Sequence, residues 1–203
     1  MRVLVVGGTG RVGRRVVEGL REAGHVPTVF ARDISATPEG VRAIAGDVRD
    51  RDAVREALDG QDAVASALGT PPGGTVDDTL SAGTGTLVAA MREAGVDRIV
   101  AVGAAGVLDA PGGGLRLEAP GFPPFLRAVA AEHRRVHGTL ADSDLTWTLV
   151  CPPNMPDGAA TGDARIERDR LPEGGERVTT GDVAAFVVRA LEEGPNGRVG
   201  IAG

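Results

Sequence analysis

Short apolar runs alternate with longer segments of helical periodicity throughout the 203 residues. The apolar runs are rich in β-branched residues and show no polar face, which is typical of strands that are covered on both sides. Strands are expected at 3–6, 26–31, 41–45, 63–66, 99–102, 146–150 and 197–201, and helices at 12–23, 51–58, 76–94, 125–142 and 183–192. Strands that alternate with helices predict an α/β fold with a doubly wound, mostly parallel sheet, formed by residues 1–203 as a single domain.

Glycine and aspartate residues mark the ends of several predicted helices. Gly24 and Gly95 each follow a helical stretch, where a residue in the left-handed conformation closes a carboxyl terminus. Asp182 precedes the last helix and is predicted to be its N-cap. Two segments with many Gly and Pro residues, 109–124 and 152–172, are too long for ordinary connections. Because each follows a strand, on the side where doubly wound sheets bind ligands, we expect substrate-side loops, with simple surface insertion as the alternative.

The first predicted strand and the first predicted helix are joined by the sequence GGTGRVG, residues 7–13. Gly7 permits a tight turn, Gly10 lets backbone amides approach an anion closely, and Gly13 lets the helix pack on the strand. The helix N-terminus favours negative charge, because its amides are unpaired and its dipole is positive there. This strand–turn–helix context predicts a Rossmann-type site for the pyrophosphate of a dinucleotide.

The residues after the second predicted strand decide which dinucleotide is expected. An acid there would accept hydrogen bonds from a ribose hydroxyl and select NAD(H), whereas an arginine would pair with the 2′-phosphate of NADP(H). Arg32 occupies the selecting position, and Arg11 and Ser35 could donate to the same phosphate. NADP(H) is therefore favoured over NAD(H). Asp33 leaves the alternative open, because a small shift in register would make it the ribose ligand and reverse the preference.

Two shorter segments at predicted strand ends are further candidates for cofactor binding. Asp47 and Val48 follow the third strand, where they could bracket the adenine. Leu68, Gly69 and Thr70 follow the fourth strand, where the glycine allows the nicotinamide half to approach. Taken alone, each segment could instead be an ordinary turn.

The composition excludes several chemistries. The chain has no tyrosine and its 22 basic residues are all arginine, so it has no lysine for a Schiff base or a phosphate-binding P-loop, and no proton-donating tyrosine.

A net charge of −6 without a run of like charges disfavours nucleic-acid binding. No apolar stretch reaches the roughly 18 residues that span a bilayer, and no signal peptide is evident. Because the single cysteine, Cys151, cannot form an internal disulfide, we expect a cytoplasmic protein, and we expect it to bind no membrane. Cys151 itself is expected to pack in a strand, with a reactive thiol as the alternative.

With these residues placed, the chain resembles the atypical short-chain dehydrogenase/reductases, and most of all the biliverdin-IXβ and NADPH-dependent flavin reductases among the NmrA-like proteins. The likeness runs nearly end to end. It rests on GGTGRVG, FARD, GDVRD, GQDAVASALGT, AAMREAGVDRIVAVGAAG, AEHRRVHGTLADSDLTW, LVCPPNMPDG and ERVTTGDVAAFVVRAL, of which the helix and PP segments are the specific part. The resemblance implies a monomer that binds NADPH in preference to NADH and transfers hydride directly to a flavin, a tetrapyrrole or a quinone.

The resemblance also implies a set of cofactor contacts, with two departures from the family pattern. Ala104 replaces the family's serine after the fifth strand, and Asn154 replaces the histidine after its two prolines. The Tyr-x-x-x-Lys pair of the wider superfamily is impossible here, whereas hydride transfer to a flavin needs no such tyrosine, because the reactive centres are on the two cofactors. The implied contacts are Gly7, Thr9, Gly10, Arg11, Val12, Arg32, Ser35, Asp47, Val48, Leu68, Gly69, His133 and Pro153, with Leu80 as a packing contact.

No catalytic residue is fixed by the pattern, and His133 and Asn154 are the candidates. By the resemblance, His133 would hold the nicotinamide end or relay a proton; the alternative is a solvated histidine on a helix face. His133 and His137 are four residues apart, yet no third ligand accompanies them, so no metal site is expected. The main hypothesis is an NADPH-dependent reductase of a flat conjugated acceptor. The alternative, motivated by Ala104 and Asn154, is a non-catalytic NADP(H)-binding regulator that senses redox state.

Overall fold

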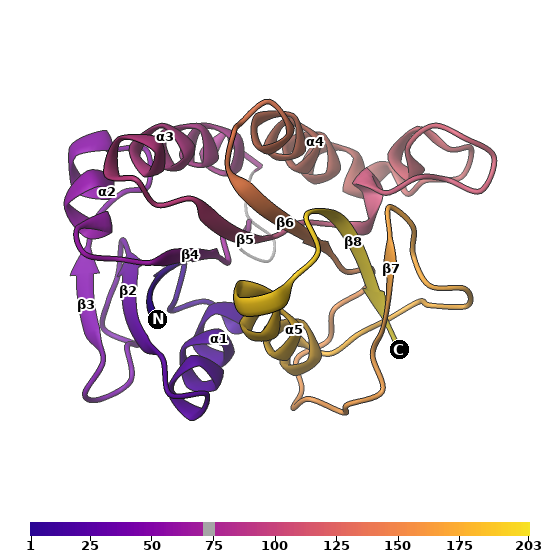
Figure 1. Cartoon of the computed structure of the whole chain (residues 1–203). Helices are drawn as coiled ribbons and strands as arrows, with labels where there is room; N and C mark the ends of the chain where they lie inside the picture. The colour runs from indigo at the N-terminus through magenta and orange to yellow at the C-terminus, as the bar shows by residue number, and fades with distance from the viewer. Residues whose placement is uncertain (71–75) are drawn as a thin grey trace.

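The computed structural model describes residues 1–70 and 76–203. Within these residues eight strands form one sheet, in the order β3-β2-β1-β4-β5-β6-β8-β7 (Figure 1). The strands are β1 (Arg2–Val6), β2 (Val26–Ala31), β3 (Arg42–Ala45), β4 (Ala63–Ser66), β5 (Arg98–Val102), β6 (Thr146–Cys151), β7 (Arg165–Arg168) and β8 (Gly197–Ala202). The α-helices are α1 (Arg11–Glu22), α2 (Arg51–Leu58), α3 (Thr79–Ala94), α4 (Arg127–Ala141) and α5 (Thr180–Glu193). This architecture confirms the predicted doubly wound α/β fold.

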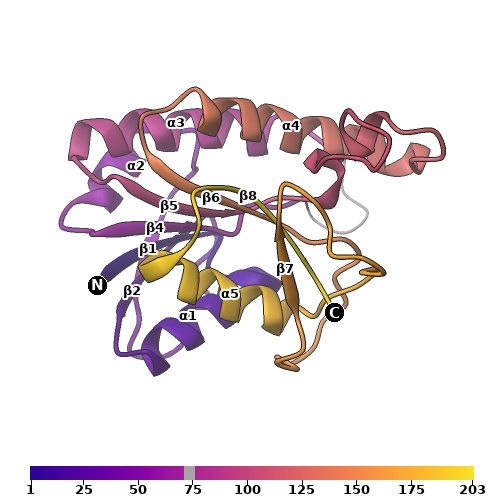
Figure 2. The same cartoon turned by 45° about the vertical axis from the view of Figure 1, so that its right-hand side comes forward.

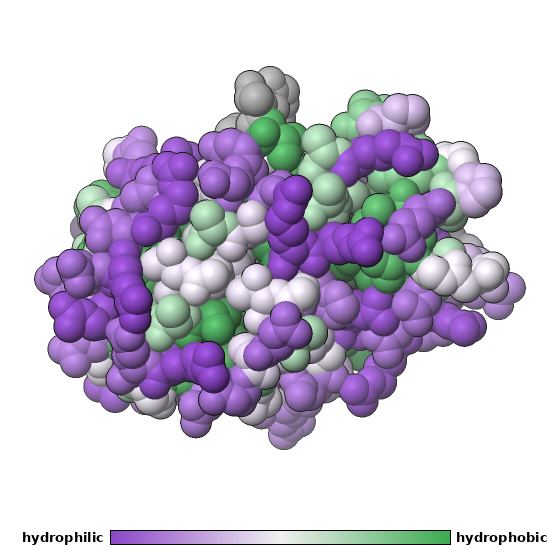
Figure 3. Space-filling model, turned by 90° about the horizontal axis from the view of Figure 1, so that it is seen from above, coloured by the Kyte–Doolittle hydropathy of each residue, from purple (hydrophilic) through white to green (hydrophobic). Residues whose placement is uncertain are grey.

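Helices cover the sheet on both faces (Figures 1 and 2). One face carries α2, α3 and α4, and the other carries α1 and α5. The side chains of β1 alternate accordingly, because Leu4 and Val6 belong to the core under α2–α4, whereas Val3 and Val5 belong to the core under α1 and α5. Burial on both faces explains why this strand is apolar at successive positions. The outer surface over α3 and α4 is mainly hydrophilic, with scattered apolar patches (Figure 3).

Seven of the strands are parallel to one another, and each confirms a predicted strand to within one residue at either end. The exception is β7, which pairs antiparallel with β8 at the edge of the sheet. It lies inside the segment 152–172, so the expectation of a loop is wrong for Arg165–Arg168. The strand was not visible in the sequence because all four of its residues are exposed and three are charged. Charged side chains on an edge strand discourage pairing with another chain.

The start of α5 differs from the prediction, and Asp182 is not its N-cap. Thr179 occupies that position, and its hydroxyl accepts a hydrogen bond from the Asp182 amide (3.0 Å). The Asp182 carboxylate lies in the first turn, where it accepts hydrogen bonds from the Thr179 hydroxyl (2.6 Å) and from the amides of Thr161 (2.8 Å) and Gly162 (3.0 Å). Asp182 therefore connects the loop before β7 to the N-terminus of α5. The position of Asp182 in the sequence does not by itself reveal this connection.

The remaining helix ends follow the predictions more closely. Gly95 (φ 67°) and Gly24 (φ 78°) adopt left-handed conformations after α3 and α1, as expected. α3 begins three residues later than predicted, and a 3₁₀ turn at Pro124–Leu126 precedes α4, so the predicted helix 125–142 is divided. Among the helices that the structure describes, none combines the length and the apolar character needed to cross a membrane.

Arg198 on β8 joins the two long segments that interrupt the alternation of strands and helices. Its guanidinium donates to Asp109 Oδ1 (2.9 Å), to Asp169 Oδ1 (3.0 Å) and to the carbonyl oxygen of Val107 (2.8 Å). Asp169 is in the left-handed region (φ 58°), which costs energy for a residue with a side chain. Because the Arg198 side chain is only 14% exposed, the two segments are held together at a largely buried cation.

The order of the strands reverses between β1 and β4. After β1 the chain continues to β2 and β3 on one side, and after β4 it continues to β5 and β6 on the other. The turns that leave β1 and β4 therefore diverge at the carboxyl edge of the sheet. A crevice opens at this reversal, which is where doubly wound sheets bind their ligands.

Candidate functional site

A cleft of about 560 Å³ lies at this crevice and follows the carboxyl edge of the sheet. Its walls come from the ends of β1 to β5, the N-termini of α1 and α3, the middle of α4 and the segment after β6. Most of the predicted cofactor contacts line it, namely Gly7, Thr9, Gly10, Arg11, Val12, Arg32, Asp47, Val48, Leu68, Gly69, Thr70 and His133. The structure thus brings together residues from distant parts of the sequence.

The glycine turn lies at the centre of the cleft, between β1 and α1. Gly7 has φ 75°, and a side chain there would place its Cβ 2.8 Å from the Ala67 carbonyl oxygen. A Cβ on Gly13 would lie 2.2 Å from the Gly7 carbonyl oxygen, so α1 packs directly against the turn. The first hydrogen bond of α1 runs from the Arg14 amide to the Gly10 carbonyl (3.0 Å), so the amides of residues 11–13 have no partner within the helix. This geometry fits an anion at the N-terminus of α1.

The end of β2 presents Arg32 and Asp33 to the cleft. Arg32 is exposed and makes no hydrogen bond or ion pair with any other described residue. Asp33 is engaged locally, because its Oδ1 accepts a hydrogen bond from the Ser35 backbone amide (2.9 Å), and this bond lowers the pKa of the Asp33 carboxyl. Ser35 belongs to this local turn and does not line the cleft. The cationic side chain is therefore the free group at this position.

Asp47 and Val48 line the cleft beside Arg32, at the end of β3. The Arg49 guanidinium donates to both carboxylate oxygens of Asp47 (2.8 and 3.1 Å), and these hydrogen bonds lower the pKa of Asp47 to about 2. Val48 is held from behind, since a Cβ on Gly83 of α3 would lie 2.4 Å from its Cγ1. This end of the cleft therefore carries charged side chains, and Val48 is packed against α3.

The part of the lining that comes from β4, β5, α3, α4 and the segment after β6 is mainly apolar, and its polar side chains are Thr70, Thr79 and His133. The His133 side chain is largely buried, and its Nδ1 has no hydrogen-bond partner among the described residues. Burial lowers the pKa of His133 to about 4, so the imidazole is neutral at physiological pH. The neighbouring Glu132 accepts a hydrogen bond from the Ser81 amide in the first turn of α3 (3.2 Å), which fixes α4 against the start of that helix. The Nδ1 atom of His133 is thus a buried polar atom without a partner among the described residues, which is uncommon in folded proteins.

Several residues singled out in the sequence lie away from the cleft. Pro153 is half-buried and Asn154 is exposed, and neither lines it. The Asn154 carbonyl accepts a hydrogen bond from the Val178 amide (3.0 Å), which is a structural contact. Ala104 also lies outside the lining, although the adjacent Gly103 is part of it. Cys151 is buried behind Gly103, and burial raises the pKa of its thiol to about 12, as expected for a packed residue.

Sequence reasoning missed part of the lining. Most of these residues are at the ends of predicted strands or one position beyond them, so a candidate set that included those positions would have found them. Met155 and Thr79 gave no such signal, because their places depend on how the segment after β6 and α3 fold back on the sheet. The missed residues are Val6, Phe30, Ala31, Gly46, Ala67, Thr79, Val102, Gly103 and Met155.

The described part of the chain contains no group of three or more His, Cys, Asp and Glu side chains that could hold a metal ion. His137 does not pair with His133 as a ligand but stacks edge-on against the Trp147 ring, with 5.8 Å between ring centroids. Trp147 lies near the start of β6, at the other end of the strand from the cleft, and is half-buried.

Replacement of Gly13 tests the packing of α1 on the turn. Because the new Cβ of Gly13→Ala would overlap the Gly7 carbonyl oxygen, we expect the free energy of unfolding to fall by about 1–3 kcal/mol. Gly85→Ala in the interior of α3 is the matched control, since a Cβ there meets open space. The control should raise stability by about 0.5–1 kcal/mol, because alanine favours a helix over glycine. Denaturant unfolding would measure both, and equal effects would contradict the packing role.

Burial of His133 predicts a specific dependence of stability on pH. Its folded pKa of about 4 lies below the ordinary value of 6.5, so between these values the unfolded chain binds more protons. This contribution to stability is complete above about pH 6.5 and is lost as the pH falls, amounting to about 2 kcal/mol between pH 7 and pH 5. The decline should be correspondingly smaller in His133→Leu. Denaturant unfolding at each pH would measure the free energy of unfolding of wild type and variant. If the two fell in parallel, the imidazole would not be buried in its neutral form.

Comparison with known proteins agrees with the geometry of the cleft. Residues 7–194 match a family described as NAD(P)H-binding. Over 97% of its length the chain is 33% identical to a 3-diazoavenalumate denitrifying reductase from Streptomyces sp, of which it covers 74%. Among solved structures it is similar to a proposed exported protein from Burkholderia pseudomallei (33% identity, TM-score 0.87, 100% of both chains). It is also similar to a proposed NADH-flavin reductase from Streptococcus pneumoniae (25% identity, TM-score 0.83, 100% of this chain and 99% of the other).

The family match spans the glycine turn, the ends of β2 to β6 and the whole of α4, which together form the cleft. The fold is shared over the full length of the chain. The chain therefore belongs to the NAD(P)H-binding family of Rossmann-fold proteins.

Proposed function

We propose that this NAD(P)H-binding oxidoreductase transfers a hydride from NADPH to a flavin or another flat conjugated acceptor. The observation that carries the proposal is the polarity of the cleft. Arg32, with no protein partner among the described residues, lies at one end, and the neutral imidazole of His133 lies in the apolar wall at the other. The glycine turn lies between them, where a pyrophosphate would join the two halves of a dinucleotide.

The residues of the cleft fit NADPH in one orientation. The amides that open α1 would bind the pyrophosphate, and Gly7, Gly10 and Gly13 provide the close approach that a Cβ would prevent. Arg32 would pair with the 2′-phosphate, and the engagement of Asp33 by the Ser35 amide favours Arg32 as the selecting residue. Asp47 and Val48 would flank the adenine. When bound, NADPH supplies the hydride, and the acceptor takes the accompanying proton from solvent.

The nicotinamide end favours acceptors that need no acid from the protein. Tyrosine and lysine are absent from the chain, His133 is neutral, and Cys151 is buried behind the cleft. Its residues would therefore orient the two rings and exclude water, with the neutral His133 as part of the wall that faces them. Two of the similar proteins are named for acceptors other than carbonyls, a diazo compound and a flavin. These names support an acceptor of this general kind.

Arg32→Ser tests the preference for NADPH. Removal of a charge-assisted hydrogen bond to the 2′-phosphate should weaken NADPH binding about tenfold or more, whereas NADH binding should change little. Arg42→Ser is the control, because Arg42 is an exposed arginine at the opposite end of β3, outside the cleft. Calorimetric titration of both cofactors into each variant would measure the effect. Equal or tighter binding of NADH by the wild type would overturn the role of Arg32.

The acceptor is tested by NADPH oxidation with FMN, riboflavin, biliverdin, simple quinones and an aryl diazonium compound. We expect turnover with at least one of them, with no requirement for an added metal ion. Tight NADPH binding without oxidation by any acceptor would overturn the reductase assignment. That result, combined with capture of a protein partner whose affinity differs between NADP⁺ and NADPH, would instead indicate a redox-sensing regulator.

A further inference from the structure

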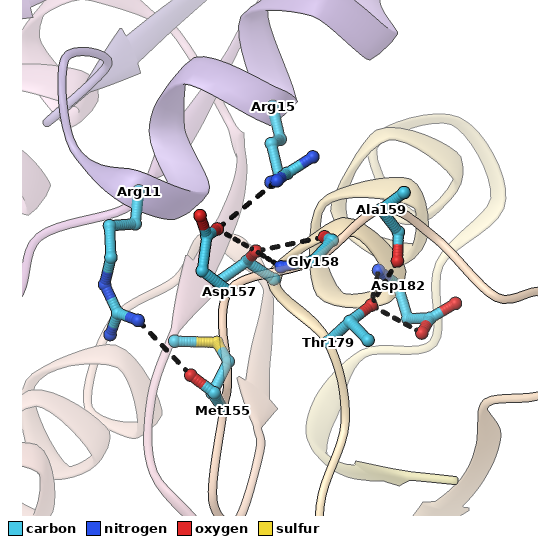
Figure 4. A network of polar contacts seen from close by, with 9 residues as sticks. Arg11, Arg15, Met155, Asp157, Gly158, Ala159, Thr179 and Asp182 are labelled. Atoms are coloured by element: carbon cyan, nitrogen blue, oxygen red, sulfur yellow. Dashed lines mark hydrogen bonds and ion pairs between the residues drawn. The ribbon is translucent and has the colours of Figure 1, made fainter.

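The segment after β6 lies against the first turns of α1 through two arginine contacts (Figure 4). Arg11 Nη1 donates to the carbonyl oxygen of Met155 (3.4 Å), and Arg15 Nη2 donates to Asp157 Oδ1 (3.3 Å). Arg11 and Arg15 are four residues apart, so they lie on the same side of the helix, facing the segment. The helix that opens at the glycine turn therefore also supports this part of the cleft wall.

The other side of the same segment is fixed by the start of α5. Thr180 Oγ1 donates to Asp157 Oδ1 (2.7 Å), and the Thr180 amide donates to the Pro156 carbonyl (3.1 Å). The Val178 amide donates to the Asn154 carbonyl (3.0 Å). Met155 lies between these anchored neighbours, and on the α1 side its carbonyl is held by Arg11. Its contact with Arg11 is long and exposed, and by itself such a contact fixes a position weakly.

Arg11 and Met155 both line the cleft, but at functionally different places. Arg11 lies at the N-terminus of α1, where the pyrophosphate is expected, and Met155 follows β6, on the opposite side of the strand reversal from β2 and β3. A guanidinium has five N–H donors, and within the described residues Arg11 uses one nitrogen, for Met155. Its remaining donors are available to an anion on the same helix terminus. Arg11 is thus placed to contact a phosphate and the Met155 carbonyl at the same time.

We infer that Arg11 is a positioning residue that bridges the bound pyrophosphate and the Met155 carbonyl, so that cofactor binding fixes the wall of the acceptor half of the cleft. Charge-assisted hydrogen bonds to phosphate are stronger than the single bond to a neutral carbonyl, so the phosphate would immobilise the guanidinium and, through it, Met155. The inference rests on the proposed function for the identity of the two halves. It predicts that the acceptor half is completed only when the cofactor is in place.

The three methionines of the chain provide a direct test by NMR of ¹³C-labelled methyl groups. Met155 lines the cleft, Met91 is buried in the core and Met1 is exposed at the chain start. The probe is 2′-phospho-ADP-ribose, which carries the pyrophosphate but lacks the nicotinamide ring that would shift nearby signals directly. At saturation the wild-type Met155 signal should move by more than its line width, while the Met91 signal stays in place. Met155→Leu assigns the signal.

Substitutions on α1 separate Arg11 from its neighbours. In Arg11→Gln, compared at equal probe occupancy measured by calorimetry, the Met155 response should be lost. Arg14→Gln is the matched control, since Arg14 is exposed on the same turn and its side chain makes no hydrogen bond or ion pair with the described residues. Asp157→Asn weakens the second anchor and should keep the response, because Arg11 carries it. With NADPH saturating, the acceptor KM should rise about threefold or more in Arg11→Gln and not in Arg14→Gln.

The outcomes distinguish this inference from the proposed function. If the probe binds the wild type and the Met155 signal does not move, the bridge is wrong and the reductase assignment stands. A normal response in Arg11→Gln, or its loss in Asp157→Asn to the same degree, also overturns the role of Arg11. If the probe does not bind the wild type at all, the cofactor assignment fails, and the inference fails with it.

Discussion

The contact between Gly13 and the carbonyl oxygen of Gly7 determines where α1 lies, and most of the site depends on that position. With no room for a Cβ, the helix begins directly on the turn, and its unpaired amides face the cleft. Arg11 and Arg15 reach the segment after β6 only from this placement. Through Asp157, the same chain of contacts continues to the N-terminus of α5. Two glycines thus align two helices and one wall of the cleft.

Burial and charge divide the cleft into two halves with different chemistry. The half beside β2 and β3 carries the cation of Arg32 and the ionised Asp47, whose charge is stabilised by Arg49. In the other half, burial keeps His133 neutral. A polar, ionic ligand portion is favoured at the first and a flat apolar ring at the second. This division matches the two parts of a dinucleotide cofactor, a phosphorylated nucleoside and an uncharged redox ring.

The sequence was sufficient to predict the parallel strands and the phosphate turn, because both follow from local rules. A strand covered on two faces must be apolar at successive positions, and a turn at a helix N-terminus that admits an anion must contain glycine. The edge strand β7 was missed because exposure removes the apolar signal. Asp182 was misplaced by three residues because Thr179, an equally good cap, precedes it.

The residues that line the cleft likewise divide into those that local rules predict and those that they do not. Residues such as Arg32 and Gly69 directly follow predicted strands, so their place at the sheet edge could be foreseen. Met155 and Thr79 reach the cleft through the packing of whole segments, and Pro153 lies beside it without entering. Ser35, a phosphate contact by sequence, lies outside the lining, and its backbone amide donates to Asp33. Local turn contacts of this kind become visible only in the folded chain.

Under the proposed function, a site without an ionisable acid at its acceptor end must obtain selectivity from shape. Around that end, His133 is neutral and the Cys151 thiol remains protonated, so neither contributes charge to an acceptor. Of the two long segments, Met155 lines the cleft, whereas Arg198 holds the segments together through Asp109 and Asp169 outside the lining. These contacts lie apart from the glycine turn and from Arg32. Substitutions at the Arg198 junction are therefore expected to act on the two long segments and to leave the glycine turn and Arg32 in place, which is compatible with one fold serving several functions.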